Sequence, residues 1–360
     1  MKSQDILRLR LSNQRLTAPT QDDAVALVRW MGAVQAQDYA GAKWALGCRL
    51  KGVSDIALDE MIDNGDILRT HVLRPTWHFV LPEDIRWMIT LTEPRITAFG
   101  AKYFRDLELD KKLLNRSNRI ITKALEGGDH LTKKEIGALL EKNKIPTNDL
   151  RLTFIIIRAE LDQLVCNGAR RGKQFTYALL ETRAPKAVQL KKDEALTALA
   201  QRYFLSRGPA TLKDFTWWSG LSAVDARAAV ESVKSQFDQE TVGGQLYLYA
   251  SSAIKPANVS GAHLLPAWDE YTVAYKDRSL VIDPEFSDKV GNGIFNFNIL
   301  WKGQIIGAWK RTVKGDKVIV DLNYFRTPSP AVAKKISSVA NHYAKFLNKK
   351  AEQSIQRPSK

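Results

Sequence analysis

The sequence has few cysteines and histidines. Its 360 residues include 2 cysteines, Cys48 and Cys166, and 5 scattered histidines. A disulfide framework needs several cysteines, and a zinc site needs Cys or His ligands at short spacings. The sequence predicts neither, and we expect no metal and no cofactor.

Long apolar runs and familiar catalytic motifs are also missing. No run of 18 apolar residues occurs, and the start of the chain, MKSQDILRLRLSNQRL, lacks the apolar centre of a signal peptide. We therefore expect a cytoplasmic protein associated with the nucleoid. The absence of a GxGxxG motif, a P-loop, a Ser-His-Asp pattern and a metal-ligand cluster argues against an unrelated soluble enzyme.

Positive charge is in clear excess. The chain carries 54 Lys and Arg against 39 Asp and Glu, a formal net charge of +15. Such an excess favours a polyanionic partner, with nucleic acid first and an anionic membrane surface second. A solvated basic surface without a ligand is the alternative. The length exceeds one ordinary core and indicates two or three domains.

The first hundred residues predict a winged helix-turn-helix. An amphipathic helix is expected at 20–35, with Thr20 as its N-cap and Asp22 and Asp23 in its first turn. Further helices and then a pair of β-branched and aromatic strands are expected at 42–50, 54–64 and 67–80. Helices followed by a two-stranded ribbon are typical of a winged helix.

The same order is repeated along the chain. Thr132 and Glu135 form the pattern of a capping box, and a second helix from Asn148 and a hairpin follow. Thr211 and Asp214 repeat that opening, before a helix at Ser222, a Gly-Gly turn and a strand. We interpret these segments as a second and a third winged helix in tandem.

The predicted fold class is α+β and mostly helical. It comprises three tandem winged helix-turn-helix units and a C-terminal β-rich element, which together form a concave basic surface for DNA. The expected boundaries are 1–100, 101–188, 189–255 and 256–360. The last part contains a hairpin at 295–310 and a closing helix at 329–347, and its polar end, NKKAEQSIQRPSK, is expected to fray.

Two glutamines, Gln35 and Gln37, flank Ala36 directly after an apolar helical stretch. An amide is costly to bury without hydrogen-bond partners. Residues i and i+2 lie about 200° apart around a regular helix. We therefore expect the helix to end or distort here, so that both amides reach the same space. The alternative is a helix C-terminus whose carbonyls the amides cap.

Four segments together resemble the AlkZ/YcaQ-type DNA glycosylases, a family of tandem winged-helix proteins that excise N7-alkylated bases. They span nearly the whole chain: LSNQRL (11–16), GAVQAQDYAGAKWAL (32–46), LRTHVLRPTWHFV (68–80), and LLPAWDEYTVAYKDRS (264–279) followed by GQIIGAWKR (303–311). The family signature is Gln, an apolar residue, then Gln or Asp. Gln35-Ala36-Gln37 places the chain in the Gln-ending, AlkZ-like branch.

The resemblance implies a monofunctional DNA glycosylase with Gln35 and Gln37 as catalytic residues. An N7-alkylated purine is cationic, so it leaves without being protonated. An amide oxygen can orient a water and stabilise an oxocarbenium-like sugar. Some members of the family unhook crosslinks, so the resemblance also implies bulky adducts and interstrand crosslinks as possible substrates. The implied partner is double-stranded DNA with alkylated bases, bound by a monomer.

Several other residues are candidates for the site. Asp38 lies one residue beyond the acidic position of the Asp-ending branch, and a cap or a surface ion pair is its alternative role. Trp44 and His71 are candidates to line the base pocket, and core packing is the alternative for both. Each of the proposed DNA contacts could instead be a structural or solvated side chain: Arg69, Arg74, Lys133, Lys134, Arg151, Arg158, Arg170, Arg171, Lys173 and His263.

A second function fits part of this pattern. A non-catalytic winged-helix DNA-binding protein, a transcriptional regulator or an architectural module, requires only the basic charge and the repeats. In that case the two glutamines are incidental. The sequence shows no heptad pattern for the dimerising segment that a regulator usually carries. Release of a free alkylated base discriminates the two functions.

Overall fold

The computed structural model describes residues 1–17, 19–20, 23–250, 261–291 and 293–356. The chain forms two compact units. Unit 1 comprises Met1–Leu58, Thr197–Trp218 and Ala223–Lys360, and unit 2 comprises Asp59–Leu196 and Ser219–Ser222. The chain passes from one unit to the other within helices α4 (Asp55–Asn64) and α10 (Lys192–Arg207).

Unit 2 contains two small β-elements and a helical core. Strands β2 (Leu68–Val72) and β3 (Thr76–Val80) form an antiparallel hairpin, as the sequence predicted. A second antiparallel sheet has the order β4-β6-β5, with strands Leu131–Thr132, Thr176–Leu179 and Val165–Asn167. The helices are α5 (Ile85–Asp106), α6 (Lys111–Leu125), α7 (Lys133–Lys142), α8 (Arg151–Leu161) and α9 (Leu180–Arg183).

The core of unit 2 lies where α6, α7 and α8 meet the hairpin of β5 and β6. Buried apolar side chains from each helix, including Ile121, Ile136 and Ile155, form one cluster with Val165 and Tyr177. Such burial stabilises by roughly 25 cal/mol for each Å² of apolar surface removed from water. The packing fixes the start of α7 and the strands beside it, which carry most of the basic side chains discussed below.

The start of α7 confirms the predicted capping box. The Thr132 hydroxyl accepts a hydrogen bond from the Glu135 N–H, and the Glu135 carboxylate accepts one from the Thr132 N–H at 2.7 Å. These bonds, together with Arg171, lower the pKa of Glu135 to about 2. In unit 1, Thr211 and Asp214 form the same reciprocal pair before α11 (Leu212–Ser219). The two helix starts therefore share the same hydrogen-bonded structure as well as the same sequence pattern.

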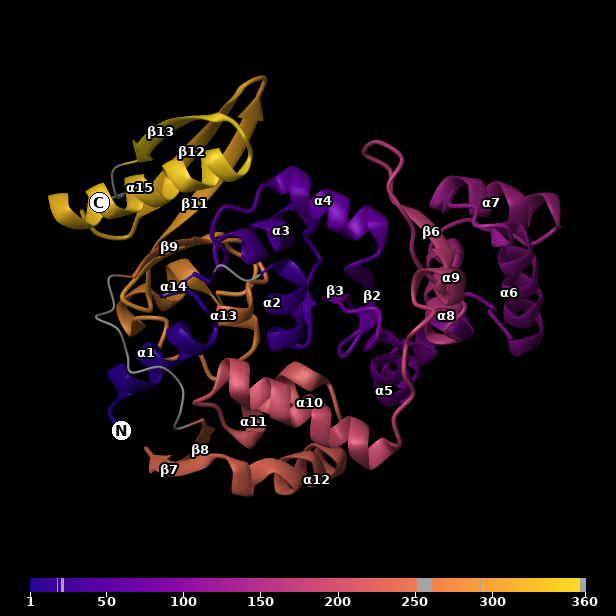
Figure 1. Ribbon diagram of the computed structural model, residues 1–360, viewed down its shortest axis with the longest axis horizontal. Helices are drawn as coiled ribbons and strands as arrows, with labels where there is room; N and C mark the ends of the chain where they lie inside the picture. Colours follow the sequence, from indigo (N-terminus) through magenta and orange to yellow (C-terminus); the bar gives the residue numbers. More distant parts are fainter. Residues whose placement is uncertain (18, 21–22, 251–260, 292, 357–360) are drawn as a thin grey trace. The chain divides into compact units, whose positions relative to one another are not determined.

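Unit 1 is built on a five-stranded sheet with the order β13-β12-β11-β10-β9 (Figure 1). Helix α15 (Pro330–Phe346) runs beside this sheet (Figure 1). Between β10 and β11, Lys302 and Gly303 both have positive φ, which matches the predicted Lys-Gly turn. The strands are Ala262–Leu265 (β9), Asn298–Trp301 (β10), Gln304–Lys314 (β11), Lys317–Tyr324 (β12) and Lys350–Gln356 (β13).

Strand β13 corrects the prediction of a fraying tail. It pairs in parallel with β12, from Lys317 opposite Lys350 to Asn323 opposite Gln356. Helix α15 joins the two strands, as a parallel pair requires. The polar composition of the segment concealed the strand, because its backbone partner lies about thirty residues earlier in the chain. Residues 357–360 lie outside the described residues.

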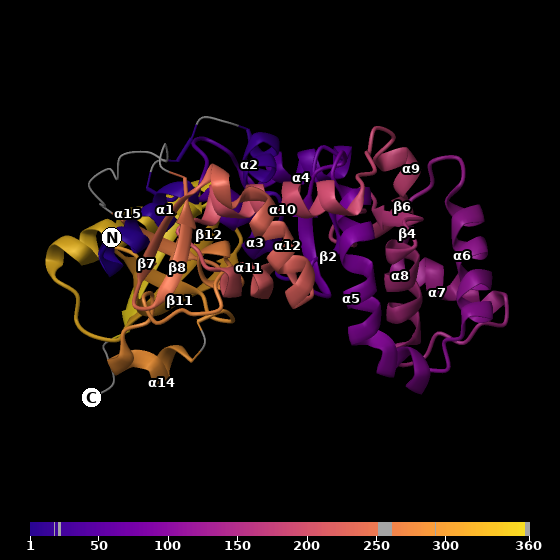
Figure 2. The same cartoon turned by 90° about the horizontal axis from the view of Figure 1, so that it is seen from below.

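The rest of unit 1 is mainly helical. Strands β7 (Asp238–Val242) and β8 (Gln245–Tyr249) form a hairpin around the predicted turn Gly243-Gly244 (Figure 2). The remaining α-helices are α1 (Ser3–Asn13), α2 (Ala24–Met31), α3 (Tyr39–Gly47), α12 (Ala223–Val233), α13 (Glu270–Val273) and α14 (Ser287–Val290). The division into three winged helices plus a β-rich element stays a prediction.

The start of α2 differs from the expectation. Asp23 is the N-cap, and its carboxylate accepts a hydrogen bond from the Ala26 N–H at 2.7 Å. Thr20 is not the cap, because its backbone N–H and C=O bond to the backbone of Arg49 and Lys51. The helix consequently begins four residues later than predicted. Asp22, which was expected in the first turn, lies outside the described residues.

Candidate active site

The helix that precedes the two glutamines ends before it reaches them. Helix α2 stops at Met31, and Gly32 follows with a φ of +73°. An L-residue is strained in this conformation, whereas glycine adopts it freely. The chain then runs extended through Val34 and Gln35 (β1), and α3 begins at Tyr39. The helix thus ends close to the glutamines, as expected, but it stops four residues before the predicted boundary at residue 35.

The segment passes from buried to exposed positions within three residues. The Gln35 side chain is 4% exposed and Ala36 is completely buried, whereas Gln37 is exposed. One amide is therefore enclosed by protein and the other is open to water.

A buried ion pair lies beneath this segment. The Arg207 guanidinium contacts the Glu270 carboxylate at 2.7 Å and 3.0 Å, and the indole N–H of Trp218 donates to the same oxygen at 3.0 Å. Arg207 and Glu270 are both fully buried. Buried charges are tolerated when they are paired and hydrogen-bonded in this way.

The ion pair also binds the backbone that leads to the glutamines. Glu270 Oε1 accepts a hydrogen bond from the Gln35 N–H at 2.9 Å. Arg207 donates to the carbonyls of Met31 at 2.6 Å and Ala33 at 2.8 Å. The Met31 carbonyl is one of those that a helix end leaves without an intrahelical partner. Three alternate backbone groups are thus fixed by two charged side chains, which orients the start of the Gln-Ala-Gln segment.

A second buried ion pair supports the first. Arg49 makes two contacts of 2.8 Å with Asp269, the neighbour of Glu270. It also donates to the backbone and the side-chain oxygens of Gln14. Burial lowers the pKa of Arg49, but Asp269 and Glu270 outweigh it and hold that pKa above its ordinary value. Asp269 in turn accepts from the Tyr271 N–H and caps α13.

Asp38 has a structural role. It precedes α3 without a side-chain cap bond, and its carboxylate lies 3.3 Å from Arg311. Gly41 passes so close that an added Cβ would lie 2.6 Å from this carboxylate. The ion pair that the sequence offered as the alternative role of Asp38 is therefore present.

Trp44 lies in the core, a placement that does not support its expected role in lining the base pocket. It is completely buried, its indole N–H donates to the Leu264 carbonyl at 2.6 Å, and its ring packs on Tyr343 and Phe346. No surface remains for a base.

His263 is also buried, in the middle of β9. Burial, aided by Arg49, lowers its pKa to about 4, so the imidazole is neutral near pH 7. A buried neutral ring adds no positive charge to a DNA surface, and this placement does not support the expected DNA contact.

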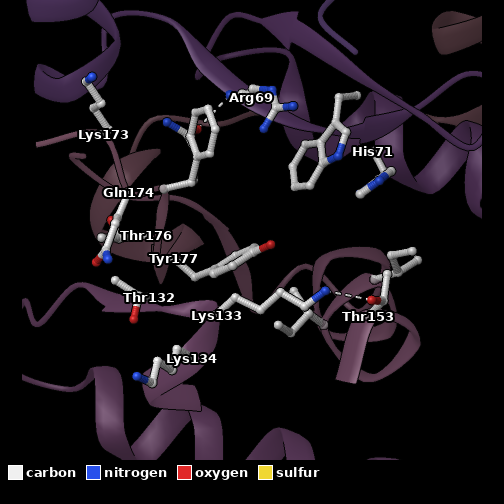
Figure 3. Close-up of a pocket in the computed structure, with 15 residues that line it drawn as sticks. Arg69, His71, Thr132, Lys133, Lys134, Thr153, Lys173, Gln174, Thr176 and Tyr177 are labelled. Carbon is white, nitrogen blue, oxygen red and sulfur yellow. Dashed lines mark hydrogen bonds between the residues drawn. The ribbon is translucent and has the colours of Figure 1, made fainter. Parts of the chain in front are cut away.

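Five of the other candidates line one cavity in unit 2, with a volume of about 520 Å³ (Figure 3). They are Arg69, His71, Lys133, Lys134 and Lys173. The His71 ring bonds to the buried carboxylate of Glu160 at 2.6 Å. The sequence expected these basic residues to contact DNA, and their role stays a prediction.

Four of the remaining candidates have partners within the protein. Arg158 contacts Glu93 and Asp162, Arg170 contacts Asp59 and Asp63, and Arg171 contacts Glu135. Arg151 donates to the backbone carbonyls of Leu107 and Pro146. Arg74 lies half-buried at the turn between β2 and β3. Because carboxylates neutralise Arg158, Arg170 and Arg171, these three offer less charge to a phosphate than unpaired lysines do.

Two further properties bear on the chemistry. Among the residues that the structure describes, no group of three or more His, Cys, Asp or Glu side chains is arranged to hold a metal ion. Within the same ranges, each helix is too short or too polar to span a membrane.

Comparison with known proteins supplies the family. Residues 28–346 match the family described as "DNA glycosylase AlkZ-like". The chain belongs to this family. The glycosylase is also similar in structure to the Streptomyces sahachiroi DNA glycosylase AlkZ, with a TM-score of 0.79 over 99% of this chain and 100% of that one. The identity is 19%, so this likeness shows a shared fold. No curated protein matches the sequence. The chain is a DNA glycosylase, and its substrate is DNA.

The sequence did not reveal the residues that support the Gln-Ala-Gln segment. Arg207 was not identified, and Asp269 and Glu270 appeared only inside the segment LLPAWDEYTVAYKDRS. Two adjacent acids within an apolar stretch were the available signal, because buried carboxylates require partners. Nothing in the sequence around Arg207 indicated that it would be the partner.

Proposed function

We propose that this glycosylase is monofunctional and excises N7-alkylated guanine from DNA, with a water molecule oriented by Gln35 and Gln37. The observation that carries the proposal is the arrangement of the segment. An exposed Gln37 follows a buried Gln35 whose backbone is bonded to a fully buried ion pair. The arrangement supports an exposed Gln37 amide that follows a rigidly held backbone, and a fixed position next to water is what water-directed hydrolysis requires.

The proposed reaction needs little acid–base chemistry from the protein. Alkylation gives the purine a positive charge, so the electron pair of the C1′–N9 bond moves onto the base and neutralises it. The water oxygen bonds to C1′ as that bond breaks, and the released proton passes to solvent. The Gln37 amide oxygen accepts a hydrogen bond from the water, and both amide dipoles stabilise the developing sugar cation. The products are the free alkylated base and an abasic site.

The same chemistry extends to larger lesions. In a crosslink between two N7 atoms, each linked purine is cationic and each glycosidic bond is activated. One excision then breaks the covalent link between the strands and leaves the linked bases attached to one of them. We propose that bulky N7 adducts and interstrand crosslinks are substrates on this ground.

The test is release of 7-methylguanine from an oligonucleotide duplex under single-turnover conditions. We expect Gln37→Ala and Gln35→Ala each to lower the rate by roughly 10² to 10³, as loss of a transition-state hydrogen bond does elsewhere. Gln239→Ala is the matched control, because Gln239 is an exposed glutamine in unit 1 far along the chain from the motif. It should release base at the wild-type rate.

DNA binding is measured alongside the rate. Both glutamine variants should bind the modified duplex within a few-fold of wild type, so that the loss lies in the chemical step. Release by Gln37→Ala at the control rate contradicts the proposed mechanism. Absence of release by the wild-type protein from any N7-alkylated duplex contradicts the proposed substrate class.

A further inference from the structure

The cavity in unit 2 is an open pocket formed by elements from several parts of the chain. Strands β2 and β3, the start of α7, helix α8 and the loop before β6 all contribute to its wall (Figure 3). The Asn167 side chain accepts a hydrogen bond from the Arg69 N–H at 2.6 Å and so links β5 to β2. Lys133 donates to the Thr153 hydroxyl at 2.7 Å across the cavity wall (Figure 3). Hydrogen bonds therefore connect the elements of the cavity wall, and the cavity has the volume of an ordinary small-molecule site.

The lining is cationic. It includes one arginine and three lysines, and no aspartate or glutamate is among the lining residues. Two carboxylates that contact lining residues already have partners: Glu160 bonds His71, and Glu135 pairs with Arg171. Within the described part of the chain, Lys134 and Lys173 have no ion-pair partner. The cavity therefore presents positive charge that the protein itself does not neutralise.

The same cavity has aromatic walls. Trp77, Phe175 and Tyr177 line it, and the Arg69 guanidinium lies 4.1 Å from the Trp77 ring centroid and 4.9 Å from the Phe175 ring centroid. Phe175 is 40% exposed, although it is large and apolar. An exposed aromatic ring beside lysines without ion-pair partners is a combination that binds nucleotides: the ring stacks on a base and the cations contact phosphate.

We propose that this cavity is a nucleotide-binding site, separate in sequence from the Gln-Ala-Gln segment. The base stacks against the exposed Phe175 ring, and the phosphate is bound by Lys134 and Lys173 with Lys133 beside them. The ligand chemistry is an aromatic base with an attached phosphate, which a free nucleotide and a nucleotide of a DNA strand both provide. The site does not depend on which lesion the enzyme excises.

Binding is tested by isothermal titration calorimetry of the full chain with dGMP, deoxyguanosine and inorganic phosphate. We expect dGMP to bind at least about tenfold more tightly than either fragment, because it alone uses rings and cations together. Lys134→Ala and Phe175→Ala should each weaken dGMP binding by roughly fivefold or more.

Matched controls are available on the same unit. Lys142→Ala removes the same charge from an exposed position of α7 outside the cavity, and Phe99→Ala removes a phenylalanine that is 70% exposed on α5. Both should bind dGMP as wild type does. Thermal unfolding verifies that all four variants are folded. We expect them to fold because the substituted side chains are exposed.

A second arm identifies the source of the nucleotide. A fluorescent single-stranded oligonucleotide is titrated with the same variants, and dGMP is then added as competitor. Weaker oligonucleotide binding by Lys134→Ala and Phe175→Ala but not by the controls, with displacement by dGMP, assigns the site to a DNA nucleotide. Tight dGMP binding without an effect on the oligonucleotide assigns it to a free nucleotide.

The proposal is overturned if the cavity variants bind both probes as the control variants do. It is also overturned if inorganic phosphate binds as tightly as dGMP, since the aromatic walls then contribute nothing. Because both probes are unmodified, these outcomes are independent of whether 7-methylguanine is released.

Discussion

The carboxylate of Glu270 accepts a hydrogen bond from the backbone N–H of Gln35 at 2.9 Å, although the two residues lie 235 positions apart in sequence. The same carboxylate binds Arg207, which bonds the two alternate carbonyls before Gln35. The conformation of the Gln-Ala-Gln segment therefore depends on an ion pair from distant parts of the chain. Substitution of Glu270 can therefore alter the position of the glutamines while the glutamine side chains themselves stay unchanged.

Substitution of Glu270 tests the positioning role. Glu270→Gln keeps an oxygen that can accept from the Gln35 N–H but leaves Arg207 without a counter-charge, whereas Glu270→Ala loses both. We expect each variant to lower the free energy of unfolding by about 3–5 kcal/mol, because a buried charge loses its partner. Single-turnover base release, measured where both variants remain folded, should be at least about tenfold faster for Glu270→Gln than for Glu270→Ala. Equal rates would indicate that the ion pair contributes stability alone.

Replacement of Gln37 by aspartate should convert an amide into a titratable group. We expect Gln37→Asp to keep base release within roughly tenfold of wild type, since a carboxylate also accepts a hydrogen bond from water. Its rate should fall as the pH drops through about 4, where an aspartate is protonated, while the amide of the wild type does not titrate. The measurement is base release from pH 3.5 to 8, corrected for release without enzyme. A variant profile parallel to that of wild type would exclude contact between residue 37 and the water.

Arg49→Lys should show how much the bidentate ion pair with Asp269 contributes to the free energy of unfolding. Arg49 bonds both carboxylate oxygens and two oxygens of Gln14. A lysine carries the charge but cannot make all of these planar contacts. We expect the free energy of unfolding to fall by about 2–4 kcal/mol in urea titrations. Lys51→Arg, at an exposed position two residues on, is the control and should be neutral.

The buried His263 should make the folded protein less stable in mild acid. Its folded-state pKa is lowered to about 4 by burial, with a smaller effect of Arg49, and an unfolded histidine titrates near 6.5. Between these values the unfolded chain binds the proton and the folded chain does not. Stability is therefore complete above about pH 6.5 and falls as the pH drops towards 4, by up to roughly 1.4 kcal/mol per pH unit.

Urea unfolding at pH 5 and pH 7.5 measures this effect. The difference in unfolding free energy between the two pH values should be smaller for His263→Gln than for wild type, because glutamine does not titrate. An unchanged difference would assign the acid sensitivity to other groups.

Several features could be predicted from the sequence because they depend on near neighbours. The capping pairs Thr132–Glu135 and Thr211–Asp214 act over three residues, and both are present. The alternating strands at 68–80 and the helix end before Gln35 depend equally on local geometry. The resemblance to AlkZ-like glycosylases rested on short segments and is confirmed by the family match over residues 28–346.

The tertiary structure alone decided which side chains are buried and which partners they have. Trp44 belongs to the core, Asp38 pairs with Arg311, and the polar tail forms β13, because each meets a partner that lies far away in sequence. The support of Gln35 by Glu270 and Arg207 has the same origin. The residue types of the Gln-Ala-Gln segment were enough to identify it as the candidate reactive segment. Desolvation and long-range pairing depend on the folded surroundings, so only the tertiary structure determined which side chains position that segment.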